Sequence, residues 1–225
     1  KGIENHTLLR VSQVLGEVMG NPNRIAVLSG PTFAREVAQG KPAAVVIASD
    51  NEELAGRIQG ALRGPTLRLY TNADLIGVEV GASLKNVIAI AAGVCDGLGL
   101  GSNATAALIT RGLAEITRLA VAMGGKPLTL MGLAGLGDLV LTCTGQLSRN
   151  RTLGQKLASG EQLADILGSM RMVAEGVQTT YAALELGQRF QTDLPIIGQV
   201  GAILDGVKTP REALRELMDR SLKGE

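Results

Sequence analysis

The spacing of apolar residues changes near residue 73, and this change constrains the fold more than any other feature. Three short runs rich in β-branched residues come before it: 24–31, 43–49 and 66–71. After the second run, Asp50 or Asn51 can cap a helix that extends to residue 63. The order strand, helix, strand is typical of α/β architecture. We therefore expect residues 1–72 to form part of an α/β domain.

Beyond residue 73 the apolar residues recur at helical spacing. Two long helices are predicted at 72–94 and 103–125, and the second has Asn103 as its expected cap and paired glycines at its end. Thr209 followed by Pro210 predicts the start of the last helix. The shorter predicted helices are 134–143, 150–159, 161–170, 177–189, 194–205 and 210–222. Residues 73–225 are thus predicted to form an all-helical domain.

Composition and charge exclude several classes of protein. The net charge is +1, the basic residues are scattered and only 2% of residues are aromatic, so no nucleic-acid surface is expected. The longest uninterrupted apolar run, 87–95, is too short to cross a bilayer, and no basic-plus-apolar leader opens the chain. Cys95 and Cys143 have apolar surroundings typical of reduced core thiols. A soluble cytoplasmic protein is therefore expected.

His6 is the only histidine, which argues against a zinc site or any other metal site and against a histidine-based catalytic triad. Any acid–base chemistry must therefore use lysine, aspartate or glutamate. Lys85 is the strongest candidate because its neighbours on a helix are small and apolar: Gly81, Ala82, Ile88 and Ala89. Such a lysine either extends to water or is desolvated with a lowered pKa, and a desolvated lysine can act as a general base. Asn86 beside it could bind a hydroxyl group.

Two glycine-rich stretches imitate a dinucleotide-binding fingerprint. Residues 99–104 fit G-x-G-x-x-A and residues 135–140 fit G-x-G-x-x-V. Each lies between predicted helices, whereas a true fingerprint follows a strand, so neither is expected to bind a dinucleotide. A true fingerprint would precede Lys1. The chain opens with Lys-Gly-Ile-Glu and no initiator methionine, which predicts that it is the later part of a longer protein.

The stretch 131–154 combines glycines, a lone acid and a Ser-Arg-Asn-Arg run. Asp138 is followed by Leu-Val-Leu and needs a partner such as Lys85 or a substrate hydroxyl. The run opens a helix whose free amides favour an anion, and the Arg149 guanidinium can grip two phosphate oxygens. A solvated helix start is the simpler explanation of that run taken alone. The clustering favours a site for an anionic, hydroxyl-bearing molecule, formed by Asp138, Thr142, Ser148, Arg149 and Asn150.

Two further stretches carry weaker signals. Residues 29–37 follow a predicted strand directly with Gly-Pro, a hydroxyl residue and a helical stretch. This order is typical of a ligand-facing edge at the carboxyl end of a parallel sheet, and a plain turn is the alternative. Glu175 precedes a glycine within 173–180 and by itself marks only a helix boundary.

Four stretches together resemble the bacterial NAD(P)-dependent glycerol-3-phosphate dehydrogenases: KGIE at 1–4, SGPTFAREV at 29–37, 76–115 around SLKNVIAIAAG, and MGLAGLGDLVLTC with SRNR at 131–151. The similarity keeps the family's order from Lys1 to about Tyr181. It implies the remnant of a Rossmann-type domain followed by an all-α domain similar to the C-terminal domain of 6-phosphogluconate dehydrogenase. It also implies reversible hydride transfer from sn-glycerol 3-phosphate to NAD or NADP, giving dihydroxyacetone phosphate. The glycerol 3-phosphate would supply phospholipid synthesis.

The resemblance also implies residue roles. Lys85 matches the family's proton acceptor. The substrate-binding positions are Lys1, Gly30, Thr32, Lys85, Asp138, Ser148, Arg149 and Asn150, with Asn86 and Thr142 as neighbours. The cofactor-binding positions are Lys1, Ala34, Arg149, Val173 and Glu175. Thr32 stands where many relatives have serine and keeps the hydroxyl group.

One departure from the family is large. The glycine-rich turn that cradles the cofactor pyrophosphate has no counterpart in this sequence, and the residue that selects NAD or NADP would also precede Lys1. We therefore expect this chain alone to bind cofactor poorly and to turn over little substrate.

Two other interpretations stay open. The 6-phosphogluconate and β-hydroxyacid dehydrogenases also join an α/β domain to a helical one, but they place lysine and asparagine four apart, whereas Lys85 and Asn86 are adjacent. A non-catalytic helical binding or dimerisation module is the second, because no fingerprint is present. The long apolar helices also make a homodimer a reasonable expectation.

Overall fold

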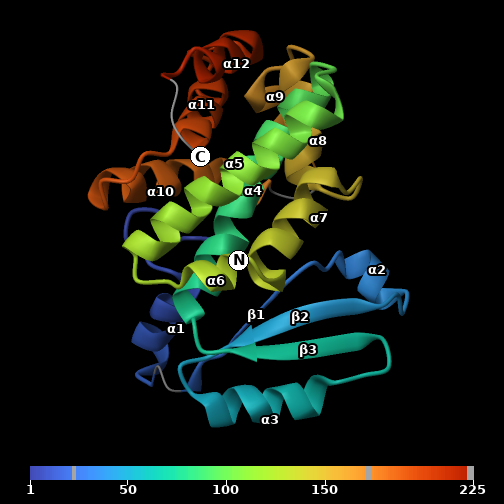
Figure 1. Ribbon diagram of the computed structural model, residues 1–225, viewed down its shortest axis with the longest axis vertical. Coiled ribbons are helices and arrows are strands. Elements are labelled where there is room, and N and C mark those ends of the chain that lie inside the picture. The colour runs from blue at the N-terminus through green and yellow to red at the C-terminus, as the bar shows by residue number, and fades with distance from the viewer. Residues whose placement is uncertain (22–23, 171–173, 222–225) are drawn as a thin grey trace.

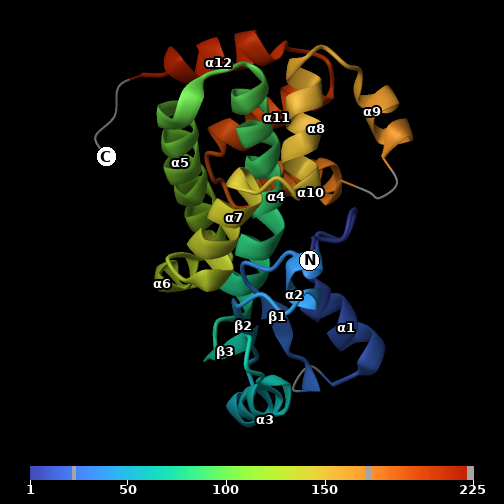
Figure 2. The ribbon, with the colours of Figure 1, turned by 90° about the vertical axis from the view of Figure 1, so that its right-hand side faces the viewer.

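The computed structural model describes residues 1–21, 24–170 and 174–221. A small α/β layer lies at one end of the molecule and a helical bundle forms the other end (Figure 1). Helix α4 (Leu75–Gly97) leaves the α/β layer and runs through the bundle, with other helices around it (Figure 2). This arrangement confirms the predicted fold class, an α/β remnant followed by helical structure.

The sheet has three strands in the order β1 (Val27–Ser29), β2 (Ala43–Ala48) and β3 (Leu67–Asn72). Strands β2 and β3 are parallel and are joined by helix α3 (Glu52–Leu62). Asn51 caps α3, because its Oδ1 accepts a hydrogen bond from the Leu54 amide at 3.0 Å. The three strands and the helix between the last two are therefore confirmed.

The predicted orientation of the segment after β1 is wrong. Strand β1 runs antiparallel to β2, with Val27 opposite Ala48, so residues 29–37 do not follow the carboxyl end of a parallel strand. The helix in this connection, α2 (Ala34–Ala38), has 5 residues. It therefore spans about 7.5 Å, whereas strand β2 is about 20 Å long. The short helix does not carry the chain back along the sheet. Strand β2 therefore starts at the end of the sheet toward which β1 runs.

Strand β2 joins the sheet to the rest of the molecule through both of its faces. Val46 and Ala48 pack with residues at the start of α4 and with Ala134. Val45 and Ile47 point to the opposite face and pack with Ala55 of α3. Because side chains alternate along a strand, one apolar run serves two layers. The sheet is thereby held against the N-terminal end of α4.

The remaining elements are helices. Before the sheet lies α1 (Val11–Met19), and after α4 come α5 (Gly101–Ala122), α6 (Pro127–Leu130), the π-helix η2 (Leu133–Gly137), α7 (Asp138–Thr144), α8 (Arg149–Ala158), α9 (Leu163–Ser169), α10 (Glu175–Arg189), α11 (Pro195–Leu204) and α12 (Pro210–Met218). The predicted helices are present, and Thr209 caps α12 as expected. The sequence reasoning did not predict α1 and α6.

The predicted cap of α5 is wrong. Asn103 lies inside the helix, which begins at Gly101 without a side-chain cap. Gly99 and Gly101 have φ values of +69° and +80°, which suit glycine. These two glycines turn the chain sharply from α4 into α5, so the helix begins before the first residue that could cap it.

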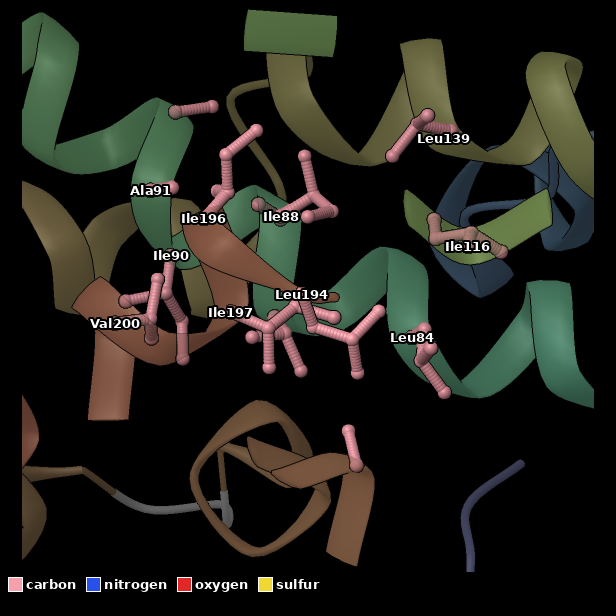
Figure 3. Packing of buried hydrophobic residues seen from close by; sticks show 14 of the residues in the cluster. Leu84, Ile88, Ile90, Ala91, Ile116, Leu139, Leu194, Ile196, Ile197 and Val200 are labelled. Atoms are coloured by element: carbon pink, nitrogen blue, oxygen red, sulfur yellow. The ribbon is translucent and has the colours of Figure 1, made fainter. Parts of the chain in front are cut away.

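Helix α4 is the centre of the main core. Its residues Leu84, Ile88 and Ile90 lie among side chains of the surrounding helices, including Ile116 of α5 and Ile197 of α11 (Figure 3). By length and composition α4 could cross a membrane, which the shorter run 87–95 did not indicate, but 89% of its most apolar window is buried inside the protein. It is therefore the core helix of this bundle.

A buried carboxylate joins α5 to α11. Glu115 is 1% exposed, and it accepts hydrogen bonds from the amides of Ile196 at 2.7 Å and Ile197 at 3.2 Å. These amides are free because they lie in the first turn of α11. Burial raises the pKa of Glu115 to about 7, and the two amides oppose this effect.

We expect the Glu115 carboxyl to make stability depend on pH. Between its ordinary pKa of 4.5 and about 7, the folded state keeps a proton that the unfolded state has lost. The contribution of Glu115 to the free energy of unfolding should therefore fall as the pH rises through this window, by on the order of 2–3 kcal/mol. Urea unfolding at several pH values should show this slope in the wild type and lose it in Glu115→Gln. The same slope in both proteins would contradict the assignment.

Candidate active site

An ion pair between α4 and α7 forms the centre of the candidate site. Lys85 Nζ donates a hydrogen bond to Asp138 Oδ1 at 2.5 Å. Lys85 is 7% exposed and Asp138 is 1% exposed. Of the two alternatives for this lysine, the structure therefore has the desolvated one, and the buried acid has the partner that it needs.

The surroundings of Lys85 set its ionisation. Burial lowers the pKa of Lys85 to about 8, the Asp138 carboxylate opposes this shift and the Lys1 ammonium adds to it. Cys143 of α7 is a buried free thiol whose pKa burial raises to about 12, so it adds no charge near neutral pH. Lys85 can therefore release and regain a proton close to physiological pH.

The π-helix η2 places Asp138 at the first position of α7. A Cβ atom at Gly135 would lie 2.1 Å from the Leu130 carbonyl oxygen, so this close turn requires glycine. Thr142, one turn later, donates a hydrogen bond to the Asp138 carbonyl oxygen at 2.6 Å, and its hydroxyl lies 3.5 Å from Oδ1. A carboxylate at a helix N-terminus is also favoured by the helix dipole.

Lys1 provides the second partner of Asp138. Its Nζ lies 2.7 Å from Asp138 Oδ2, and its side chain is 26% exposed. The two carboxylate oxygens thus each bind one ammonium group, a buried one from α4 and a partly exposed one from the N-terminal segment. The cluster reaches the protein surface at Lys1.

A second polar group links α4 and α8 to the start of α10. Glu175 is the first residue of α10, and its Oε1 lies 3.8 Å from Arg149 Nη2. Its Oε2 accepts a hydrogen bond from Asn86 Nδ2 at 3.4 Å. Asn86 directly follows Lys85 in α4, so this group lies at the same level of the helix as the lysine. The side chains of Arg149 and Glu175 are 40% and 45% exposed, which leaves the guanidinium accessible to an anion.

The other members of the Ser-Arg-Asn-Arg run hold this region in place. Ser148 caps α8, because its Oγ accepts a hydrogen bond from the Arg151 amide at 3.3 Å. Asn150 Oδ1 accepts one from the Gly176 amide at 3.0 Å, which fixes the start of α10 against α8. A Cβ atom at Gly176 would lie 2.8 Å from the Asn86 carbonyl oxygen, so α4, α8 and α10 meet closely here.

The segment after β1 approaches α7 without joining the ion pair. Gly30 has a φ of +149°, and Thr32 donates a hydrogen bond to its carbonyl oxygen at 3.3 Å. Pro31 lies 3.7 Å from the position of a Cβ atom built on Gly137, the residue before Asp138. Within residues 1–21, 24–170 and 174–221, no hydrogen bond or ion pair links Gly30, Thr32 or Ala34 to the ion pair. Val173 lies outside the described residues.

The sequence reasoning missed the residues that hold the N-terminal segment. Glu79 and Ser83 of α4 are both buried, and they bind Ser12 and Gly2 respectively. The available signal was Glu79 itself, an acid within an otherwise apolar stretch of helix, 6 positions before Lys85. A buried charge of this kind requires a partner.

The described residues suit one end of a dinucleotide cofactor. Arg149 and Glu175 present accessible charged groups next to Asn86, the residue that follows Lys85. The glycines at 99–104 connect α4 and α5, and those at 135–140 belong to η2 and α7, so neither stretch follows a strand. These two glycine-rich stretches therefore supply no strand-to-helix cradle for a pyrophosphate.

The fold and site define a class of protein: a dehydrogenase that joins an α/β domain to a helical domain carrying a buried lysine. Residues 74–215 match the family described as NAD-dependent glycerol-3-phosphate dehydrogenase C-terminus, and residues 1–55 match its N-terminus. The chain belongs to the NAD-dependent glycerol-3-phosphate dehydrogenase family. The resemblance seen in the sequence is thereby confirmed.

Individual relatives agree with this assignment. The chain is 57% identical over 224 residues to a protein of Koribacter versatilis named glycerol-3-phosphate dehydrogenase (NAD(P)+). The alignment covers 98% of this chain and 66% of that protein. A protein of Geobacter metallireducens with the same name is 56% identical, over 100% of this chain and 68% of its own length. The crystal structure of glycerol-3-phosphate dehydrogenase from Coxiella burnetii has a TM-score of 0.92 and 43% identity, over 98% of this chain and 67% of that one. The chain thus spans about two thirds of these relatives.

Proposed function

We propose that this chain forms the substrate-binding and catalytic part of an enzyme that interconverts sn-glycerol 3-phosphate and dihydroxyacetone phosphate with NAD or NADP. The observation that carries the proposal is the buried Lys85–Asp138 ion pair, together with an accessible arginine at the start of α8, the helix that packs against α4. An alcohol loses a proton and a hydride when it is oxidised to a ketone. A base of tuned pKa and an anion-binding group are what this substrate requires.

In the proposed reaction Lys85 handles the proton. Neutral Lys85 accepts the hydroxyl proton of glycerol 3-phosphate as the C–H bond at the same carbon breaks. A bound nicotinamide would supply the acceptor for the hydride. In the reverse direction, protonated Lys85 donates a hydrogen bond to the ketone oxygen and then transfers its proton to it. Asp138 keeps the Lys85 amine in position in both directions, through the 2.5 Å contact.

In this proposal the phosphate end of the substrate binds at the start of α8. Arg149 supplies an accessible guanidinium, and the first turn of α8 supplies backbone amides that favour an anion. Asn150 and Asn86 supply amide groups on either side. We propose substrate contacts for these residues and for Lys1, Gly30, Thr32, Asp138, Thr142 and Ser148, with Ala34, Val173 and Glu175 toward the cofactor.

We further propose a division of the chain into residues 1–72 and 73–225. The match to the C-terminal part of the family begins at residue 74, and α4 begins at Leu75. We also propose that the protein acts in the cytoplasm, where its glycerol 3-phosphate would supply phospholipid synthesis, and that it forms a homodimer. Exposed apolar side chains such as Leu128 and Val207 are available for contacts between subunits.

Binding of dihydroxyacetone phosphate to this chain tests the proposal directly, because the proposed phosphate site does not need the nucleotide-binding part. We expect calorimetry to detect binding and Arg149→Gln to weaken it about 10- to 100-fold, since a charge-assisted contact to phosphate is lost. The exposed Arg211→Gln on α12 is the matched control and should bind like the wild type. Dihydroxyacetone, which lacks the phosphate, should bind no better to wild type than to Arg149→Gln.

Other outcomes would favour the rival interpretations. Equal affinity in the Arg149→Gln variant would contradict the phosphate assignment. Binding of 6-phosphogluconate in preference to dihydroxyacetone phosphate would favour a 6-phosphogluconate dehydrogenase relative. Failure of dihydroxyacetone phosphate, glycerol 3-phosphate and NADH alike to bind would favour a non-catalytic helical module.

A further inference from the structure

The N-terminal segment is held to α4 at two points one helical turn apart. At its beginning, the Gly2 amide donates a hydrogen bond to Ser83 Oγ at 3.1 Å. At its end, Glu79 accepts hydrogen bonds from the Ser12 amide at 2.8 Å and from the Ser12 hydroxyl at 2.6 Å. We name residues 2–12 the anchored loop. Lys1 lies immediately before its first anchor, and the N-terminus lies beside α4 in both ribbon views (Figures 1 and 2).

The anchor at Glu79 is a buried charged cluster. Glu79 is 5% exposed and also forms an ion pair with Arg10, whose guanidinium donates a further hydrogen bond to Ser12 Oγ at 3.0 Å. Removing one member of such a cluster leaves the others desolvated and unpaired. Glu79 therefore determines where the far end of the anchored loop lies on α4.

The loop between the anchors is internally bonded, partly buried and has two strained backbone positions. A β-bridge joins Ile3 to Arg10, and the Glu4 amide donates a hydrogen bond to the Leu9 carbonyl oxygen at 2.9 Å. Ile3 and Leu8 are buried in the main core. His6 and Leu8 have φ values of +73° and +61°, which non-glycine residues rarely adopt unless their surroundings enforce them. A loop this constrained transmits the position of one anchor to the other.

We propose that Glu79 is a positioning residue, which acts through the anchored loop to hold Lys1 against Asp138 beside Lys85. This inference rests on the proposed function, in which Lys85 is the base. Lys85 is faced by Asp138 and the Cys143 thiol from α7 and by Lys1 from the N-terminal segment, while its neighbour Asn86 contacts Glu175 of α10. Of these groups, Lys1 is the one carried by the segment that binds Glu79.

The effect of Glu79 should therefore appear in the ionisation of Lys85. When the loop is released, the Lys1 ammonium no longer repels the charged form of Lys85. Asp138 then keeps its ion pair with Lys85 but loses the one with Lys1. Since Lys1 lowers the pKa of Lys85 in the intact cluster, Glu79→Gln should raise it. We expect a rise of about one pH unit.

The test measures Lys85 directly in this chain by NMR titration of lysines labelled with ¹³C at Cε, with Lys85→Gln used to assign the resonance. Glu79→Gln and Lys1→Gln should each raise the pKa of Lys85, and Glu79→Gln should add nothing in the Lys1→Gln background. The exposed Glu216→Gln on α12, which breaks an ion pair with Lys208, is the matched control and should leave this pKa unchanged. Ser12→Ala, which removes the two hydrogen bonds of the hydroxyl but keeps the amide bond to Glu79, should give a smaller shift if Glu79→Gln fails to fold.

Two results would overturn the inference. One is a Glu79→Gln variant that is less stable but has an unchanged Lys85 pKa, which would make Glu79 merely structural. The other is a full additional shift in the double variant, which would show that Glu79 does not act through Lys1. The expected shifts in a chain that binds no substrate or cofactor would instead support the positioning role and contradict the proposed function, so the two failures are distinguishable.

Discussion

Lys85→Met should lower kcat for oxidation of glycerol 3-phosphate by about 10³-fold, because general base catalysis contributes on this scale. Methionine keeps the length and apolar character of the side chain but has no basic nitrogen. Asp138 would keep one partner, since Lys1 binds its second oxygen. The assay needs a complete nucleotide-binding part, and a fusion that places the N-terminal third of the Koribacter versatilis relative before Lys1 would supply it. Binding of dihydroxyacetone phosphate should fall far less than kcat.

The pH dependence of this fusion gives a second measure of Lys85. With a pKa of about 8, Lys85 is mostly protonated below that pH and mostly neutral above it. The value of kcat/KM for oxidation, which needs the neutral form, should therefore rise as the pH increases through about 8 and then level off. For reduction of the ketone, which needs the protonated form, it should fall over the same range. A Lys85→Met variant that kept wild-type kcat or this pH profile would rule out Lys85 as the base.

Gly154→Ala should destabilise the protein by about 3 kcal/mol or more, because two helix backbones touch where α4 crosses α8. A Cβ atom on Gly154 would lie 2.0 Å from the Ile90 carbonyl oxygen, and one on Gly93 would lie 1.9 Å from the Arg151 carbonyl oxygen. Backbone atoms cannot move aside as a flexible side chain can, so the helices must separate. For a chain of this length such a loss lowers Tm by about 6–12 °C.

The matched control is Gly198→Ala in α11, where a Cβ atom would have nothing within 4 Å. At this partly exposed helix position the change should stabilise the protein by about 0.4–1 kcal/mol, because alanine has less conformational freedom to lose on folding. Thermal unfolding of the two variants should thus shift in opposite directions. Similar Tm values for both would contradict the close crossing of α4 and α8. Because Arg149 and Asn150 begin α8, Gly154→Ala should also weaken binding of dihydroxyacetone phosphate.

The features that the sequence predicted correctly depend on residues near each other in the chain. Asn51 and Thr209 cap their helices through bonds to amides three residues later. The apolar spacing of α4 likewise predicted a long helix. The capping rule failed at the start of α5, where two glycines nearby in the chain set the first residue of the helix. Asn103 lost its expected position because Gly99 and Gly101 had already turned the chain into α5.

The candidate site shows the opposite case. Lys85 and Asp138 are 53 positions apart, and Lys1 and Asp138 are 137 apart. The sequence could name Lys85 and Asp138 as possible partners, but no spacing rule brings them within 2.5 Å, and Lys1 entered only through the family resemblance. The direction of β1 was mispredicted for the same reason, since strand direction depends on pairing with a distant segment.

The sequence by itself determined the family, the change from α/β to helical structure and the apolar helix on which Lys85 lies, because periodicity, caps and long motifs are local properties of the chain. Only the tertiary structure decided that Lys85 is desolvated, that Asp138 is its partner and that Glu79 and Ser83 hold the segment carrying Lys1. Burial and ion pairing are properties of packed surfaces, and those surfaces exist only after α4, α7, α8 and α10 come together.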